Sequence, residues 1–135
     1  MPEPFVDTNI FVRHLVQDHP RLGAKATAIL ARIEVGELVA RTTDTVIFET
    51  VFTLSSVYKL SRPDLVASLL PLIELPGLVL PGKEAFRAAF DLFLTTNIGF
   101  ADCYHAVLMQ RLGLNEVLSF DRDFDRLPGI TRREE

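Results

Sequence analysis

Short apolar runs alternate with helical patterns along this chain, and that alternation constrains its fold more than any other feature. The runs cover residues 5–6, 38–40, 78–80 and 117–118, with a candidate fifth at 130–131. Strands that are separated by helices pair in parallel through right-handed crossovers. We therefore predict an α/β fold, a three-layer α/β/α sandwich around a central, mostly parallel sheet of four or five strands.

Apolar residues at three- and four-residue spacing predict the helices between these runs. The first helix begins near Ile10 and ends before Pro20. Later helices are expected at residues 21–34, from the cap candidates 42–44 to 59, 61–73, 83–94 and 100–112. Ser61 and Asp64 resemble a capping box, and the helix that they open is expected to run to residue 73 unless Pro71 kinks or ends it early. The connections are short, so we expect one domain over residues 1–135.

Composition narrows the class of protein. The hydrophobic fraction of 48% supports a core, and a net charge of −4 argues against a basic protein that coats nucleic acid. One cysteine, Cys103, leaves no internal disulfide and suits a reducing compartment. Glu3 and Asp7 interrupt any signal sequence, and no apolar run reaches the ~18 residues of a membrane span. We expect a soluble cytoplasmic domain.

Carboxylates follow two of the predicted strands directly. Asp7, in Asp7-Thr8-Asn9, follows residues 5–6, and Asp121 and Asp123 follow residues 117–118. Ligands of α/β folds bind outside the carboxyl ends of parallel strands. The two motifs are therefore expected to meet, and two carboxylates ~5 Å apart repel by roughly 3 kcal/mol at an effective dielectric constant near ~20. Such repulsion calls for a cation, which indicates a metal-dependent enzyme.

Each acid also has a simpler interpretation. Asp7 is placed to cap the first helix, and Glu49 lies in a polar stripe that a solvated helix face would explain. Asp102 falls in the first turn of a helix, where the helix dipole favours an acid. Residues 121–125 could form a solvated turn, and their spacing does not match a calcium loop.

Taken together, the order of these motifs resembles the PIN-domain ribonucleases. The motifs are Asp-Thr-Asn at the first strand, a Glu after the second strand, Ala-Asp opening a late helix, and Ser-x-Asp-x-Asp-Phe at residues 119–124. Within that family the chain is similar to VapC-type toxins of toxin–antitoxin pairs. The resemblance runs from residue 5 to about residue 130.

The resemblance implies a role for each of these residues. The implied catalytic acids are Asp7, Glu49, Asp102 and Asp121. The implied metal ligands are Asp7, Asp102, Asp121 and Asp123, with the choice between Asp121 and Asp123 as the fourth acid left open. The supporting polar residues are Thr8, Asn9 and Ser119, where the family often has a threonine in place of Ser119.

The expected cofactor is Mg²⁺ or Mn²⁺, because hard cations prefer oxygen ligands. A metal-bound water would attack the phosphodiester bond in line, and the family implies a 5′-phosphate and a 3′-hydroxyl as products. One metal or two is left open. No motif surrounds His14, His19 or His105, which we interpret as packing or surface residues. Cys103 is expected to be a small buried side chain.

The expected partners are an RNA substrate, a cognate antitoxin that inserts a segment over the site, and a second copy of the chain. Arg122 and Arg126 flank the acidic turn and are our preferred phosphate contacts. Residues of one helix could serve either a dimer interface or the core. They are Val66, Leu69, Leu70 and Ile73.

Three rival interpretations remain to be weighed. A receiver-type phosphorylation switch also places acids at strand ends, but it needs a late lysine and none follows Lys83. A haloacid-dehalogenase-like phosphatase needs a second acid where Asn9 stands. A non-catalytic PIN scaffold that only binds a partner is the third, and retention of all four acids argues against it.

Overall fold

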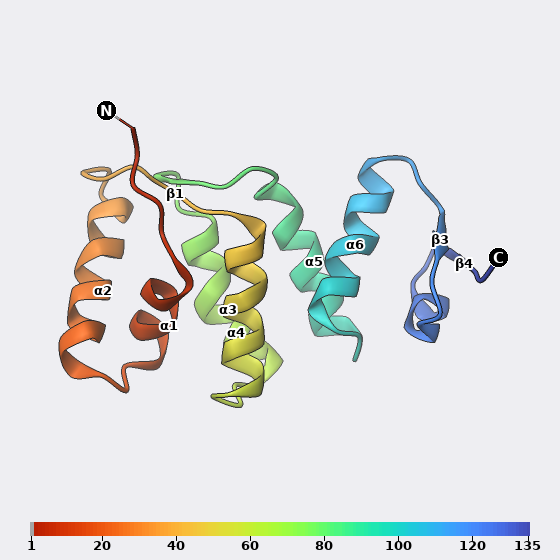
Figure 1. The fold of residues 1–135 in the computed structure, drawn as a ribbon, viewed down its shortest axis with the longest axis horizontal. Coiled ribbons are helices and arrows are strands. Elements are labelled where there is room, and N and C mark those ends of the chain that lie inside the picture. The colour runs from red at the N-terminus through yellow and green to blue at the C-terminus, as the bar shows by residue number, and fades with distance from the viewer. Residues whose placement is uncertain (1) are drawn as a thin grey trace. The chain divides into compact units, whose positions relative to one another are not determined.

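The computed structural model describes residues 2–135, in which six α-helices accompany short parallel strands (Figure 1). The chain divides into two compact units, unit 1 (Met1–Glu84) and unit 2 (Ala85–Glu135). Unit 1 contains α1 (Thr8–Val16), α2 (Pro20–Glu34), β1 (Ala40–Arg41), α3 (Asp44–Ser56), α4 (Arg62–Ile73) and β2 (Leu78–Val79). Unit 2 contains α5 (Glu84–Thr95), α6 (Phe100–Arg111), β3 (Glu116–Leu118), the 3₁₀ helix η1 (Arg122–Arg126) and β4 (Thr131–Arg133). The first residue of α5, Glu84, is the last residue of unit 1.

In unit 1 three chain segments pair in parallel, with β1 in the middle. Ala40 of β1 is in register with Leu78 of β2, and Phe5 bridges to Arg41 on the other side. The amide of Val6 donates to the carbonyl of Arg41 at 2.7 Å. The buried Thr42 hydroxyl donates to the carbonyl of Val6 at 2.9 Å, just before α3 begins. These bonds fix the point at which the chain leaves the first strand for α1, where Asp7 lies.

Side-chain caps set where the helices of unit 1 begin. Thr43 caps α3 by accepting from the amide of Val46, and Ser61 caps α4 by accepting from the amide of Asp64 at 3.2 Å. The capping interaction predicted at Ser61 is therefore confirmed. Pro71 lies inside α4, which continues to Ile73 without ending at the proline.

The residues considered for a dimer interface belong to the core of unit 1. Leu65, Leu69 and Ile73 are fully buried, and Val66 and Leu70 are nearly so. They join the buried side chains of α1 and α3, which include Phe11, Ile47 and Leu54. Core packing therefore accounts for this helix face, and these side chains are not free to form an interface.

Unit 2 packs aromatic rings between α5 and α6. Phe90 stacks on Phe100 with ring centroids 4.7 Å apart, and Phe86 stacks on Tyr104 at 4.8 Å. β3 and β4 pair in parallel, with Val117 opposite Arg132. The α5–α6 packing fixes the first turn of α6, and the strand pair fixes the segment that follows Leu118.

The predicted fold class is confirmed, because helices separate short parallel strands in the expected order. The strands pair as one two-stranded sheet in each unit, so the sheet is smaller than the predicted four or five strands. One reason is that the polar residues after each run serve the next element: Thr43 already caps α3 two residues beyond β1. Within residues 2–135 no helix is long and apolar enough to cross a membrane.

Candidate metal centre

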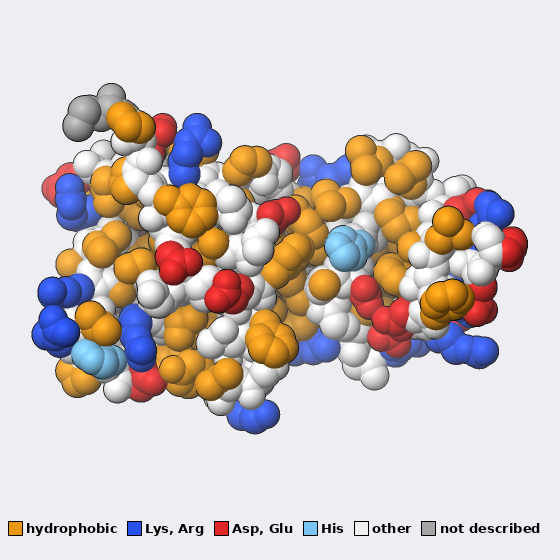
Figure 2. Space-filling model, in the orientation of Figure 1, with side chains coloured by type: hydrophobic (Ala, Val, Ile, Leu, Met, Phe, Trp, Pro, Cys, Tyr) orange, Lys and Arg blue, Asp and Glu red, His pale blue; other side chains and the backbone are white. Residues whose placement is uncertain are grey.

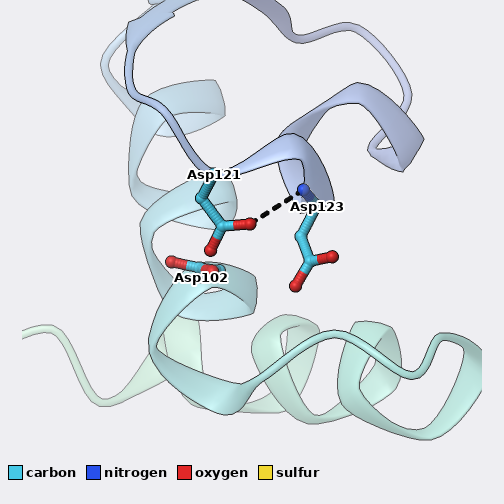
Figure 3. A group of neighbouring side chains, drawn as sticks. All are labelled: Asp102, Asp121 and Asp123. Carbon is cyan, nitrogen blue, oxygen red and sulfur yellow. Dashed lines mark hydrogen bonds between the residues drawn. The ribbon is translucent and has the colours of Figure 1, made fainter.

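Three carboxylates converge in unit 2, and we call them the acidic trio: Asp102, Asp121 and Asp123. Each offers one ligand atom, and these atoms lie within 4.8 Å of one another. Asp102 comes from the first turn of α6, whereas Asp121 and Asp123 come from the segment after β3 (Figure 3). The carboxyl groups of Asp102 and Asp121 face each other in this view.

The pKa of Asp102 is raised where these carboxylates converge. Burial is the largest cause that raises the pKa of its carboxyl group, followed by the hydrogen bond and the charge of Asp121. Asp123 raises that pKa further, while His105, one turn along α6, lowers it. Like charges have been brought together on a half-buried group, and a cation bound among them would relieve the repulsion.

The segment from Ser119 to Arg126, the acidic turn, owes its shape to its own side chains. The hydroxyl of Ser119 accepts from the amide of Asp121 at 3.0 Å, and Oδ1 of Asp121 accepts from the amide of Asp123 at 2.9 Å. Such local bonds are what Ser and Asp favour in turns. Phe124 is buried and anchors the turn. The Ser-x-Asp-x-Asp-Phe sequence therefore forms its own scaffold for two carboxylates.

Two arginines hold this turn, and we call them the arginine clasp: Arg126 and Arg132. Arg126 pairs with Asp123 at 2.6 Å and also donates to the side chain of Asn97, in the α5–α6 connection. Arg132, on β4, donates to both carboxylate oxygens of Asp125 and to the carbonyl of Ser119. Only 10% of the Arg132 side chain is exposed. The sequence analysis named Arg126 as a phosphate contact, and it missed the structural role of both Arg126 and Arg132.

The other two predicted acids lie in unit 1 and line one cavity of about 280 Å³. Asp7 occupies the N-cap position of α1, yet its side chain makes no capping hydrogen bond. The capping interpretation of Asp7 therefore lacks its hydrogen bond. Glu49 contributes to the cavity from α3, on an exposed part of that helix. Asn9 lines the same cavity.

Thr8 stands out within this cavity. It is 8% exposed, and its Oγ1 is the one fully buried side-chain N or O atom among residues 2–135 that has no hydrogen-bond partner. A buried hydroxyl without a partner is unfavourable, and native structures leave few of them.

A hydrogen-bonded network of Arg13, Asp18 and Tyr58 lies at the same cavity, which Arg13 and Tyr58 line. Arg13, on α1, donates to Oδ1 of Asp18 at 3.1 Å, and the phenol of Tyr58 donates to Oδ2 of Asp18 at 2.9 Å. The hydrogen bond from Tyr58, and then Arg13, lowers the pKa of Asp18, and the same bond raises the pKa of Tyr58. Arg13 and Tyr58 both line the cavity with Asp7 and Glu49. No sequence motif indicated that these three residues would form a network.

The histidines and the cysteine have packing or surface positions. His19 caps α2 by accepting from the amide of Leu22, and His14 hydrogen-bonds to Thr27 at 2.7 Å. His105 is exposed. Cys103 is fully buried, as predicted.

The acidic trio fits a divalent cation. Three carboxylate oxygens within 4.8 Å of one another are the donor set that Mg²⁺ and Mn²⁺ prefer. Burial first, and then the neighbouring Asp121 and Asp123, raise the pKa of Asp102, and a bound cation would offset both effects. On the face that Figure 2 shows, Lys and Arg side chains lie among apolar and acidic ones.

Short parallel strands alternate with helices, and carboxylates gather where a strand ends, so the chain is an α/β protein with a candidate carboxylate metal site. The chain belongs to the PIN domain family, which matches residues 5–130 and so covers both units. PIN domains are generally metal-dependent nucleases that bind RNA, which agrees with the acidic trio. No curated protein matches the chain significantly.

Proposed function

We propose that this protein is a Mg²⁺- or Mn²⁺-dependent endoribonuclease and the toxin component of a type II toxin–antitoxin pair. The acidic trio carries the proposal, because it gathers three oxygen ligands in a chain of the PIN domain family. The resemblance to VapC-type toxins supports the toxin role. It also supports a single domain over residues 1–135 and action in the cytoplasm.

The resemblance to the PIN-domain ribonucleases supports a role for each acid in this proposal. Asp7, Glu49, Asp102 and Asp121 are the proposed catalytic acids, and Asp123 is an additional or alternative ligand of the cation. When bound, the cation supplies positive charge that stabilises the transition state of phosphodiester hydrolysis. Asp7, which makes no capping bond, is free to act as a ligand. The expected products carry a 5′-phosphate and a 3′-hydroxyl.

Arg122 and Arg126, which the sequence analysis named as phosphate contacts, have different surroundings, and we propose different roles for them. Arg126 is held by Asp123 and Asn97, so we assign it to positioning the acidic turn. Arg122 is exposed beside Asp121 and stays our candidate for a phosphate contact. Ser119 shapes the turn through its hydroxyl, in line with its proposed supporting role.

A nuclease of this kind needs restraint in the cell. We propose that a cognate antitoxin binds over the acidic group, as is usual in toxin–antitoxin pairs of this family. A homodimer remains part of the proposal, but through a surface other than the buried face of α4.

Cleavage of a mixed cellular RNA pool by the purified chain tests the proposal. Reactions contain EDTA, Mg²⁺ or Mn²⁺, and Asp7→Asn is prepared identically. Asp91→Asn, the same change at an exposed position on α5 outside both acidic groups, is the matched control. We expect metal-dependent cutting by the parent chain and the control, and loss of cutting in Asp7→Asn. Wild-type activity in Asp7→Asn would contradict the site. A folded parent chain that leaves RNA intact would favour a non-catalytic PIN scaffold.

A further inference from the structure

We propose that Arg13 and Tyr58 form a phosphate subsite in the cavity of unit 1, which binds a backbone phosphate of the RNA substrate. The inference rests on the proposed nuclease function and names where the substrate is held. It starts from the juxtaposition of Arg13 and Tyr58 with Asp7 and Glu49 around a cavity of about 280 Å³.

The cavity is lined by side chains of both signs. Asp7 and Glu49 alone would repel a polyanion. Arg13 adds a permanent positive charge, because its guanidinium does not lose its proton in proteins. The cavity therefore offers a positively charged contact for one phosphate.

Asp18 holds the Arg13 side chain and leaves most of its N–H donors available. A guanidinium offers five N–H donors, and the pair with Asp18 joins NH1 to a single carboxylate oxygen. The other oxygen of Asp18 accepts from Tyr58, so the acid is fixed from α1 and from the end of α3 at once. The Arg13 side chain is 34% exposed, which leaves it accessible from solvent.

The unpartnered hydroxyl of Thr8 points to a ligand independently of the charges. Thr8 lines the same cavity, and its buried Oγ1 has no partner among the described residues. It lies in the first turn of α1, where backbone N–H groups are unpaired and the helix dipole favours an anion. A phosphate oxygen, directly or through water, would satisfy the hydroxyl.

The polar lining favours an RNA backbone as the occupant over an acidic peptide. Asn9, Thr53 and the Tyr58 phenol offer hydrogen-bonding groups to a sugar and a phosphate. Of the eight residues that line the cavity, Val12 is the one aliphatic side chain, which gives little for an apolar peptide side chain to bury.

Binding of a fluorescein-labelled 12-nucleotide single-stranded RNA tests the subsite. Anisotropy is measured in Ca²⁺ at several salt concentrations, and a gel verifies that the RNA stays intact. We expect Arg13→Gln to weaken binding about tenfold, the loss of one charge-assisted contact. The slope of log K against log salt should also fall in magnitude by about 0.7, the value for one phosphate contact on a single strand. A purely structural role for Arg13 would lower affinity and leave the slope unchanged.

Asp18→Asn should change RNA affinity in the opposite direction from Arg13→Gln, and it leaves Arg13 in place. It frees the guanidinium from its acidic competitor, so we expect RNA affinity to rise about threefold, in keeping with the small worth of an exposed ion pair. The matched controls are Arg21→Gln and Glu34→Gln, two exposed positions on α2 that do not line the cavity. Each control should change affinity less than its partner variant does.

The outcomes separate this proposal from the proposed function. A parent chain that neither binds nor cuts RNA overturns the nuclease itself. A parent chain that cuts RNA, with an unchanged affinity and salt slope in Arg13→Gln, overturns the subsite alone. If Arg13→Gln does not fold, Asp18→Asn decides, and unchanged or weaker binding overturns the subsite. An effect of Arg13→Gln on binding of a Glu/Leu nonapeptide but not of RNA would assign the cavity to an acidic peptide.

Discussion

The two acidic groups of this chain differ in the contacts that surround their carboxylates. In unit 2, Asp102, Asp121 and Asp123 lie within 4.8 Å of one another, and the acidic turn and the arginine clasp hold them there. In unit 1, Asp7 and Glu49 line an open cavity that also contains an arginine held by Asp18. Unit 2 brings three carboxylates together, one of them paired with Arg126, whereas in unit 1 two acids and Arg13 line one cavity.

This difference separates two tasks that a nuclease must perform. Concentrated carboxylates suit a small divalent cation, whose charge offsets their repulsion. A cavity that carries both signs suits a substrate that approaches with its own negative charge. Variants of the unit 2 group should therefore change cation binding, and variants of the unit 1 group should change substrate binding.

The largest effect is expected from Asp102→Asn. We expect it to lower RNA cleavage by at least about 100-fold, since it removes a proposed metal ligand. It should also raise the melting temperature of the metal-free protein. The pKa of Asp102 is raised in the folded state, so its ionised form destabilises the fold once the pH exceeds that pKa.

The sign of the stability effect is checked by thermal unfolding in EDTA across a pH series. The gain of Asp102→Asn over the parent should be small at acidic pH and grow as the pH rises, because only the ionised carboxyl group is repelled. Asp91→Asn should show no such trend. A lower melting temperature for Asp102→Asn at neutral pH would show that the trio is not under repulsion.

A smaller effect is expected from Arg132→Gln, which opens the arginine clasp. Asp125 loses two hydrogen bonds and the carbonyl of Ser119 loses one, so the acidic turn should move and cleavage should fall roughly tenfold. Arg132→Lys should not restore activity, because a lysine keeps the charge but lacks the planar fork. Arg133→Gln, at an exposed neighbouring position, is the control. Full activity in Arg132→Gln would show that cleavage does not depend on the arginine clasp.

Metal addition should stabilise the protein without any substitution. A ligand at 100 times its Kd stabilises the folded state by about 2.7 kcal/mol, which for a chain of this size is a rise of several degrees in melting temperature. Mn²⁺ titrations followed by calorimetry should show this rise in the parent and a much smaller one in Asp121→Asn. An equal rise in both would place the cation elsewhere.

The smallest effect concerns the network in unit 1. The phenol of Tyr58 donates to Asp18, which favours the neutral phenol and raises its pKa. In Asp18→Asn that pKa should fall back toward its ordinary value, and the change is measurable by the ultraviolet absorbance of tyrosinate. Because the folded state raises this pKa, the stability that the bond contributes is lost as the pH rises through it. An unchanged titration would exclude the bond.

Local patterns allowed most of the fold to be predicted, and tertiary contacts account for the rest. Helix periodicity and caps such as Ser61 act over a few residues, so all six helices were placed within a few residues of their ends. The sheet came out smaller than predicted because pairing depends on distant segments. At the site, the motif order indicated which acids to consider. It did not indicate that Arg126 and Arg132 would bind acids, since a partner for a long side chain is chosen by the fold.

The aromatic stacking in unit 2 makes the position of Asp102 depend on residues that never approach a ligand. Phe100 and Tyr104 flank Asp102 on α6, and their rings lie against Phe86 and Phe90 of α5. Shifting α6 by a fraction of an ångström would move its carboxylate relative to the acidic turn. In a genetic selection for inactive variants, many survivors would therefore carry changes at these phenylalanines, and their sequences would show an intact set of acids.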